Sequence, residues 1–214
     1  MAYTLRDGLH FARTGGRTIF LDAPCNRYFC LSTTAAEAFD AFLAGAFVEE
    51  GSVLLRSGVL VPDRFGFSCE PAPKIARESL LDHSESDRSR PVDTSCLLYE
   101  FAVARARITL APGRALRAMV RDRILRMPNG EPGGDPQRAA QAYLRAIRVG
   151  ASHDQCFAWG LALLRFCRKR SIPVTCIIGV SARPFRAHCW VQSRDHLIND
   201  RYDHVRNFEP ILSL

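Results

Sequence analysis

The sequence predicts an α+β protein with a small strand-rich N-terminal unit and a larger C-terminal unit, in which helices precede antiparallel strands. Three observations lead to this prediction. Residues 8–65 carry short β-type runs separated by turn signals, followed by two helical stretches. The stretch from Ser84 to Pro91 is polar and charged, and it lacks the apolar content to fold alone. Beyond it, helical periodicity returns and then gives way to an alternating, strand-like pattern.

The N-terminal unit is expected over residues 1–68 as three strands followed by two helices. Gly15-Gly16 is a hairpin signal between the first two strands, and Gly58 is expected to end the second helix. This order is typical of a winged-helix-like module. The expected strands are residues 10–14, 17–22 and 28–32, and the expected helices are residues 35–43 and 49–57.

Residues 69–94 are expected to form a linker, and residues 95–214 a second domain. Helical patterning covers 95–124, with a break near Pro112-Gly113. Residues 128–136 are predicted to be a surface loop near the active site, because Pro and Gly recur too densely for a regular element. Another helix is expected after this loop, over 137–149.

Composition excludes several classes of function. The net charge of +7 comes from arginines scattered among acids, with Lys74 and Lys169 as the only lysines, and no nucleic-acid motif is present. No apolar run approaches the ~18–20 residues that span a bilayer, and no signal sequence opens the chain. The eight cysteines show no metal-ligand spacing, so we expect free thiols in a reducing cytoplasm and neither a metal nor an organic cofactor. Nucleic acid and membranes are therefore not expected partners.

Cys156 is the predicted nucleophile of a thiol active site. Ser152 or Asp154 can cap the apolar helix that begins here, which places Cys156 in the first helical turn. The partial positive charge at a helix N-terminus favours thiolate over thiol, and the N–H groups there can stabilise an oxyanion. The alternative is a purely structural role, in which Cys156 is one of eight small core cysteines.

His188 is the predicted base, and Asp200 the group that orients it. His188 lies in a strand-like run, and the turn at Arg194-Asp195 brings the following residues back beside it. A tight two-residue turn would place Asn199 on the His188 face and point Asp200 away, whereas a bulge or a longer loop would restore Asp200. Asp200 is the better chemical partner for an imidazolium, and Asn199 remains an alternative.

These residues carry a family resemblance. The runs 177–180, 184–185, 188–192 and 198–200 resemble the C-terminal half of the lasso-peptide leader peptidases, the "B" proteins of lasso-peptide biosynthesis. These proteins are transglutaminase-like cysteine proteases, with a papain-like arrangement. By position, the resemblance implies Cys156 as nucleophile, His188 as general base and later acid, and Asp200 as the orienting group.

The N-terminal unit separately resembles the RiPP precursor peptide recognition element, a small winged-helix-like domain that binds leader peptides. The resemblance implies that the leader adds as a strand beside the third strand and packs on the last helix. The implied leader-binding residues are Tyr28, Phe29, Cys30, Leu31, Val53 and Leu54. Filling of a small core is the competing explanation for the apolar ones.

The combined resemblance implies a cytoplasmic cysteine endopeptidase that cuts the leader from a ribosomally made lasso-peptide precursor. The freed core N-terminus would then be joined to a side chain by an ATP-dependent partner resembling asparagine synthetase. Two alternatives stay open from the sequence. One is an acyl-transferring, transglutaminase-like enzyme, in which an amine replaces water. The other is a non-catalytic leader-binding scaffold for the partner cyclase.

Overall fold

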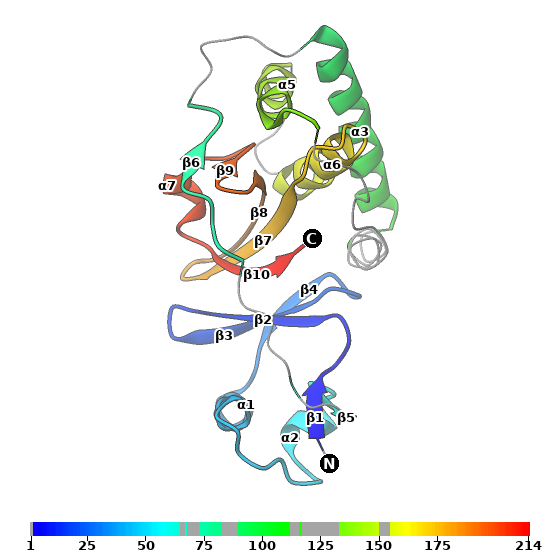
Figure 1. Ribbon diagram of the computed structural model, residues 1–214. Coiled ribbons are helices and arrows are strands. Elements are labelled where there is room, and N and C mark those ends of the chain that lie inside the picture. The colour runs from blue at the N-terminus through cyan, green and yellow to red at the C-terminus, as the bar shows by residue number, and fades with distance from the viewer. Residues whose placement is uncertain are drawn as a thin grey trace.

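The computed structural model describes residues 2–64, 67, 73–82, 90–111, 116, 133–149 and 155–214. It is an α+β protein, as predicted (Figure 1). Its helices are α1 (Thr33–Leu43), α2 (Val53–Arg56), α3 (Pro91–Leu110), α5 (Pro136–Arg148), α6 (Cys156–Arg168) and α7 (Tyr202–Val205). Its strands are β1 (Ala2–Leu5), β2 (Leu9–Thr14), β3 (Arg17–Asp22), β4 (Arg27–Cys30), β5 (Leu60–Asp63), β6 (Glu78–Ser79), β7 (Thr175–Ala182), β8 (Phe185–Ser193), β9 (His196–Leu197) and β10 (Glu209–Ser213).

The N-terminal unit is built on the antiparallel sheet β2-β3-β4, with β4 at one edge. Gly15 and Gly16 form the predicted hairpin turn. Both have positive φ, a conformation that glycine adopts more readily than other residues. The predicted second helix is shorter than expected, because α2 begins only at Val53, where the Ser52 hydroxyl caps the N–H of Leu54. A separate pairing of β1 with β5 was not foreseen. The winged-helix-like description stays a prediction.

A second sheet, in the order β10-β7-β8-β9-β6, forms the C-terminal unit. The long strands β7 and β8 pair antiparallel, and α6 packs against β8. This helix is buried on several faces, as its apolar sequence predicts. Gly160 permits the close approach, since an added Cβ there would lie 2.5 Å from the Sγ of Cys189 on β8. The start of α6 is thereby mounted rigidly beside β8.

Two buried carboxylates join the helices α3, α5 and α6. Glu100 on α3 accepts hydrogen bonds from Arg165 and Lys169 on and just after α6. Asp93, also on α3, bonds Arg138 on α5 at 2.7 Å and Arg170 at 3.1 Å. Each carboxylate is nearly inaccessible and has two cationic partners, the arrangement that buried charge requires. These pairs hold the helical layer in register behind α6.

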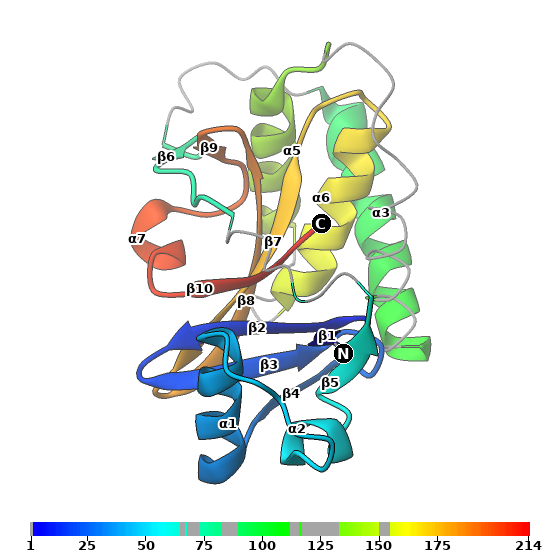
Figure 2. The same cartoon turned by 60° about the horizontal axis from the view of Figure 1, so that its bottom comes forward.

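Residues of both units contribute to a common hydrophobic cluster, while a second cluster lies within the N-terminal unit. Side chains alternate along β3, so Ile19 and Leu21 face the core of the C-terminal unit, whereas Phe20 faces the N-terminal helices. Burial of Ile19 and Leu21, at 2% and 0% exposed, contributes about 1.5–3 kcal/mol each. Strand β2 lies against β10 and β7, which is visible in both ribbon views (Figures 1 and 2). The N-terminal sheet is therefore packed directly on the C-terminal unit.

Part of the segment expected to be a linker is built into the C-terminal sheet, which corrects that prediction. Glu78 and Ser79 form β6, which pairs in parallel with β9. Upstream, the Gln192 side chain bonds the carbonyl of Lys74 and the N–H of Ala76. The composition of the segment does not predict these contacts, because they are made largely by its backbone. No helix in the described part of the chain is both long and apolar enough to cross a membrane.

Candidate active site

Cys156 is the first residue of α6, as predicted. The residue before it, Gln155, occupies the N-cap position without a side-chain capping bond, while the suggested caps Ser152 and Asp154 lie outside the described residues. The thiol is half-buried and faces the N–H groups of Cys189 and Phe157, both of which favour its ionised form. A sulfur in this position receives the positive end of the helix dipole.

His188 lies on β8 between Cys156 and Asp200. Its Nε2 is paired with Oδ2 of Asp200, and its ring also makes a hydrogen bond with Cys156. The ring stacks with Trp190 at a centroid distance of 6.1 Å and lies tilted against Phe208 at 5.1 Å, and these contacts limit its rotation. The three predicted side chains therefore meet, in the order thiol, imidazole, carboxylate.

The charges of the three groups support one another. Burial lowers the pKa of His188, but hydrogen bonds to Asp200 and Cys156 outweigh burial and raise it to about 9. Burial raises the pKa of Cys156, but the hydrogen bond and charge of His188 outweigh it, so that pKa lies below its ordinary value. Burial likewise opposes ionisation of Asp200, yet its hydrogen bonds to His188 and to the N–H of Arg201 keep its pKa low. The arrangement favours a thiolate–imidazolium pair held by a carboxylate.

A bend after β9 explains how Asp200 reaches His188. The turn at Arg194-Asp195 is the tight one, with Ser193 opposite His196, which would by itself turn Asp200 away. The strand pairing instead stops, and the chain bends over residues 198–200. Asn199 then accepts a hydrogen bond from the N–H of Val191 at 2.8 Å, while Asp200 turns to His188. Asn199, the alternative partner, thus holds the bend, and Asp200 is the carboxylate that pairs with the imidazole.

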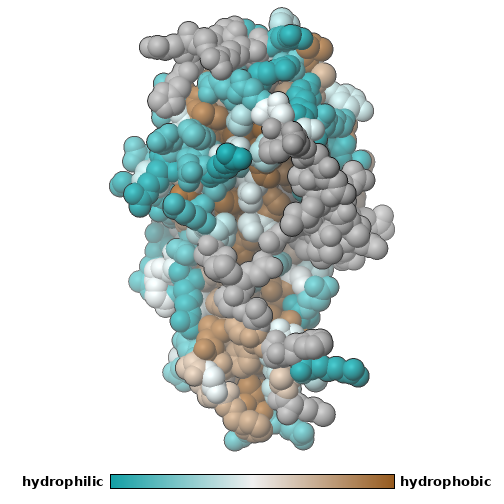
Figure 3. Space-filling view, in the orientation of Figure 1, coloured by the Kyte–Doolittle hydropathy of each residue, from teal (hydrophilic) through white to brown (hydrophobic). Residues whose placement is uncertain are grey.

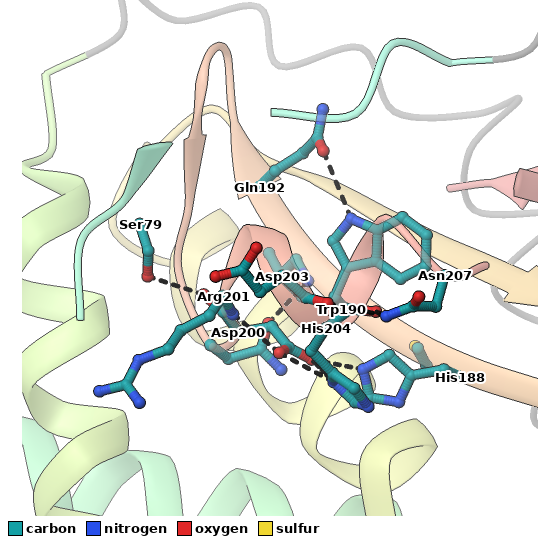
Figure 4. A network of polar contacts seen from close by, with 12 residues as sticks. Ser79, His188, Trp190, Gln192, Asp200, Arg201, Asp203, His204 and Asn207 are labelled. Carbon is teal, nitrogen blue, oxygen red and sulfur yellow. Dashed lines mark hydrogen bonds and ion pairs between the residues drawn. The ribbon is translucent and has the colours of Figure 1, made fainter. Parts of the chain in front are cut away.

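A second histidine, His204, contacts the same carboxylate. Its Nδ1 lies 3.0 and 3.1 Å from the two oxygens of Asp200, and its ring meets that of His188 edge-on at 4.5 Å (Figure 4). The sequence offered one signal for it, a spacing of four residues from Asp200 across the short helix α7. His188, Asp200 and His204 are also the one group in the described part of the chain whose donor atoms, all within 4.8 Å, could hold a metal ion. His188 and Asp200 already neutralise each other's charge. We therefore assign the three side chains to the hydrogen-bonded network around Cys156 and not to a metal site.

The six residues suggested for leader binding divide into four classes. Phe29 stacks on Phe20 at 5.3 Å, and Leu31 and Val53 are half-buried against the N-terminal core. Cys30 is exposed on the edge strand β4. Leu54 is 1% exposed and fills the core, so the prediction that it contacts a leader is not supported. Tyr28 packs against the hydrophobic cluster that includes residues of the C-terminal unit.

Comparisons with known proteins concern the C-terminal unit. The family model described as the transglutaminase-like superfamily matches residues 90–213, more than half of the chain and the whole of the Cys156, His188 and Asp200 arrangement. Neither the curated proteins nor the solved structures contain a match.

Proposed function

Because the chain belongs to the transglutaminase-like superfamily, which includes cysteine proteases and acyltransferases, we propose that it is a cysteine peptidase that removes the leader of a lasso-peptide precursor. One observation carries this proposal: the structure brings Cys156, His188 and Asp200 into a single hydrogen-bonded chain at the start of a buried helix. The sequence resemblance of the two units, a recognition element followed by a peptidase, supports leader cleavage as the particular activity.

The geometry supports a two-step reaction. The Cys156 thiolate attacks the carbonyl carbon of the last leader residue, and N–H groups at the start of α6 stabilise the oxyanion. The imidazolium of His188 then gives its proton to the departing amine, which becomes the free N-terminus of the core. The remaining thioester is attacked by water, whose proton His188 accepts, and the leader leaves as a carboxylate. Asp200 holds the imidazole in position and stabilises its charged form throughout.

Leader recognition is assigned to the edge of β4. One side of this strand pairs with β3, and in the described part of the chain no strand pairs with the other side. A free strand edge offers backbone donors and acceptors to an extended peptide. Figure 3 shows hydrophobic residues gathered over the lower, N-terminal part of the molecule, where α1 and α2 lie, and Phe47 beside them is 83% exposed. Such a surface supports docking of apolar leader side chains.

The proposal is tested by mass spectrometry of the cognate precursor after incubation with the protein. The protein is used alone and with its cyclase and ATP. We expect a single cut that releases leader and core, and we expect Cys156→Ala to abolish it. Cys25→Ala is the matched control. Cys25 is an exposed cysteine of the N-terminal unit, so this variant should cleave the precursor normally. Cleavage that survives Cys156→Ala would refute the assignment of the nucleophile.

The acyltransferase alternative is separated in the same assay. Addition of a primary amine such as glycine ethyl ester leaves the products of a hydrolase largely unchanged. An acyltransferase instead joins the amine to its acyl donor, and such products in place of free leader would overturn the peptidase proposal. Leader binding without turnover under every condition would indicate a scaffold.

A further inference from the structure

Two tyrosines flank Cys156 without being part of the catalytic chain. Tyr28 lies on β4 of the N-terminal unit, and Tyr143 lies on α5 of the C-terminal unit. Both are half-buried. Within the part of the chain that the structure describes, neither hydroxyl makes a hydrogen bond, so each can donate one to a ligand.

The position of Tyr28 follows from the register of the N-terminal sheet. Tyr28 is opposite Leu21, and both face the core shared with the C-terminal unit. Its ring contacts that of Phe185 at 5.5 Å. Phe185 and Cys189 are four residues apart on β8 and so share a face, the face on which Cys189 meets α6. Tyr28 therefore reaches the α6 side of β8, where Cys156 lies.

Tyr143 approaches from a different element, helix α5. Its ring meets Trp159 edge-on at 5.4 Å, and Trp159 lies one helical turn beyond Cys156 on α6. Burial raises the pKa of Tyr143 to about 12, and the nearby charges of Asp200 and Cys156 add to the effect. Burial also raises the pKa of Tyr28, and the charges of Cys189 and Cys156 contribute. Both phenols thus stay protonated at neutral pH and remain hydrogen-bond donors.

We propose that the hydroxyls of Tyr28 and Tyr143 form a substrate-positioning subsite that holds the last residues of the leader beside Cys156. Each hydroxyl donates to an oxygen of that segment, either a backbone carbonyl or a small side-chain hydroxyl. The leader side is favoured because Tyr28 belongs to β4, the strand assigned to leader recognition. This inference rests on the proposed function, and it makes the N-terminal unit a wall of the catalytic site in addition to a docking domain.

Tyr28→Phe and Tyr143→Phe test this inference, because each removes a hydroxyl and keeps the ring. We expect each to lower kcat/KM for precursor cleavage by about 3- to 10-fold, mainly through KM, which is the effect of losing one neutral hydrogen bond. Tyr99→Phe is the matched control, since Tyr99 is 65% exposed on α3 and should not change cleavage. Unchanged kinetics in both test variants would overturn the proposal. A purely structural role would lower the melting temperature and leave KM unchanged.

A second measurement separates this inference from the proposed function. A tripeptidyl chloromethyl ketone alkylates Cys156 after its peptide fills the leader side, whereas iodoacetamide is too small to contact the tyrosines. The Tyr→Phe variants should react about 3- to 10-fold more slowly with the peptidyl reagent and at the wild-type rate with iodoacetamide. Equal slowing with both reagents would mean that the thiol was disturbed and would overturn the subsite. If wild type fails to cleave precursor but this selectivity holds, the leader-peptidase proposal fails and the peptide subsite stands.

Discussion

Asp200→Asn is the substitution that tests the charge network most sharply. The variant keeps the size of the side chain and removes the charge that helps raise the pKa of His188 to about 9 from 6.5. The difference corresponds to about 3 kcal/mol in favour of imidazolium, to which Asp200 and Cys156 both contribute. Loss of roughly 2 kcal/mol would lower the population of the thiolate–imidazolium pair, and with it the activity, by about 30-fold.

The assay is the rate of Cys156 alkylation by iodoacetamide as a function of pH. In wild type the pKa of Cys156 is below its ordinary value of 9.0, because the charge and hydrogen bond of His188 outweigh burial. In Asp200→Asn, His188 loses its proton at lower pH, so the midpoint for thiolate formation should move up toward that ordinary value. Asp203→Asn is the control. The Asp203 carboxylate is exposed, so its removal should not move the midpoint for Cys156 thiolate formation. A wild-type midpoint in Asp200→Asn would refute the role of Asp200.

Three further substitutions probe the frame around the site. Glu100→Gln should destabilise the fold by roughly 3 kcal/mol in chemical denaturation, because two cations lose their buried partner. Asn199→Ala should lower the free energy of unfolding by about 1–3 kcal/mol, because it leaves a backbone N–H of β8 without its partner. It should also lower activity, because the bend before Asp200 loosens. Full activity would contradict the role of the bend. Gly160→Ala should cost about 1–3 kcal/mol in thermal unfolding, because its Cβ would meet the Cys189 sulfur, whereas Gly51→Ala has open space and should be neutral.

Local patterns predicted the elements that carry the catalytic side chains. The apolar run after Cys156 indicated a buried helix, and alternation around His188 indicated a strand. The hairpin at Gly15-Gly16 was equally local, because positive φ is a property of single residues. In each case a short stretch of sequence determines the structure.

Tertiary contacts decided what local patterns could not. The choice between Asp200 and Asn199 depends on a bend that Ser79 supports by donating a hydrogen bond to the Asp200 carbonyl at 2.7 Å, across more than a hundred residues of sequence. The pairing of β1 with β5 is similarly long-range. Tyr28 and Tyr143 come from separate elements, so nothing in their spacing to Cys156 indicates that they approach it. Such meetings depend on packing between elements.

Cleavage of the precursor in heavy-oxygen water tests the central claim most directly, because hydrolysis through a Cys156 thioester must place one solvent oxygen in the new leader carboxylate. Mass spectrometry of the wild-type products should show a leader that carries one heavy oxygen atom and an unlabelled core. Cys156→Ala should give no product. A leader released as an amide or ester, or labelled cleavage that persists without the Cys156 thiol, would contradict the account.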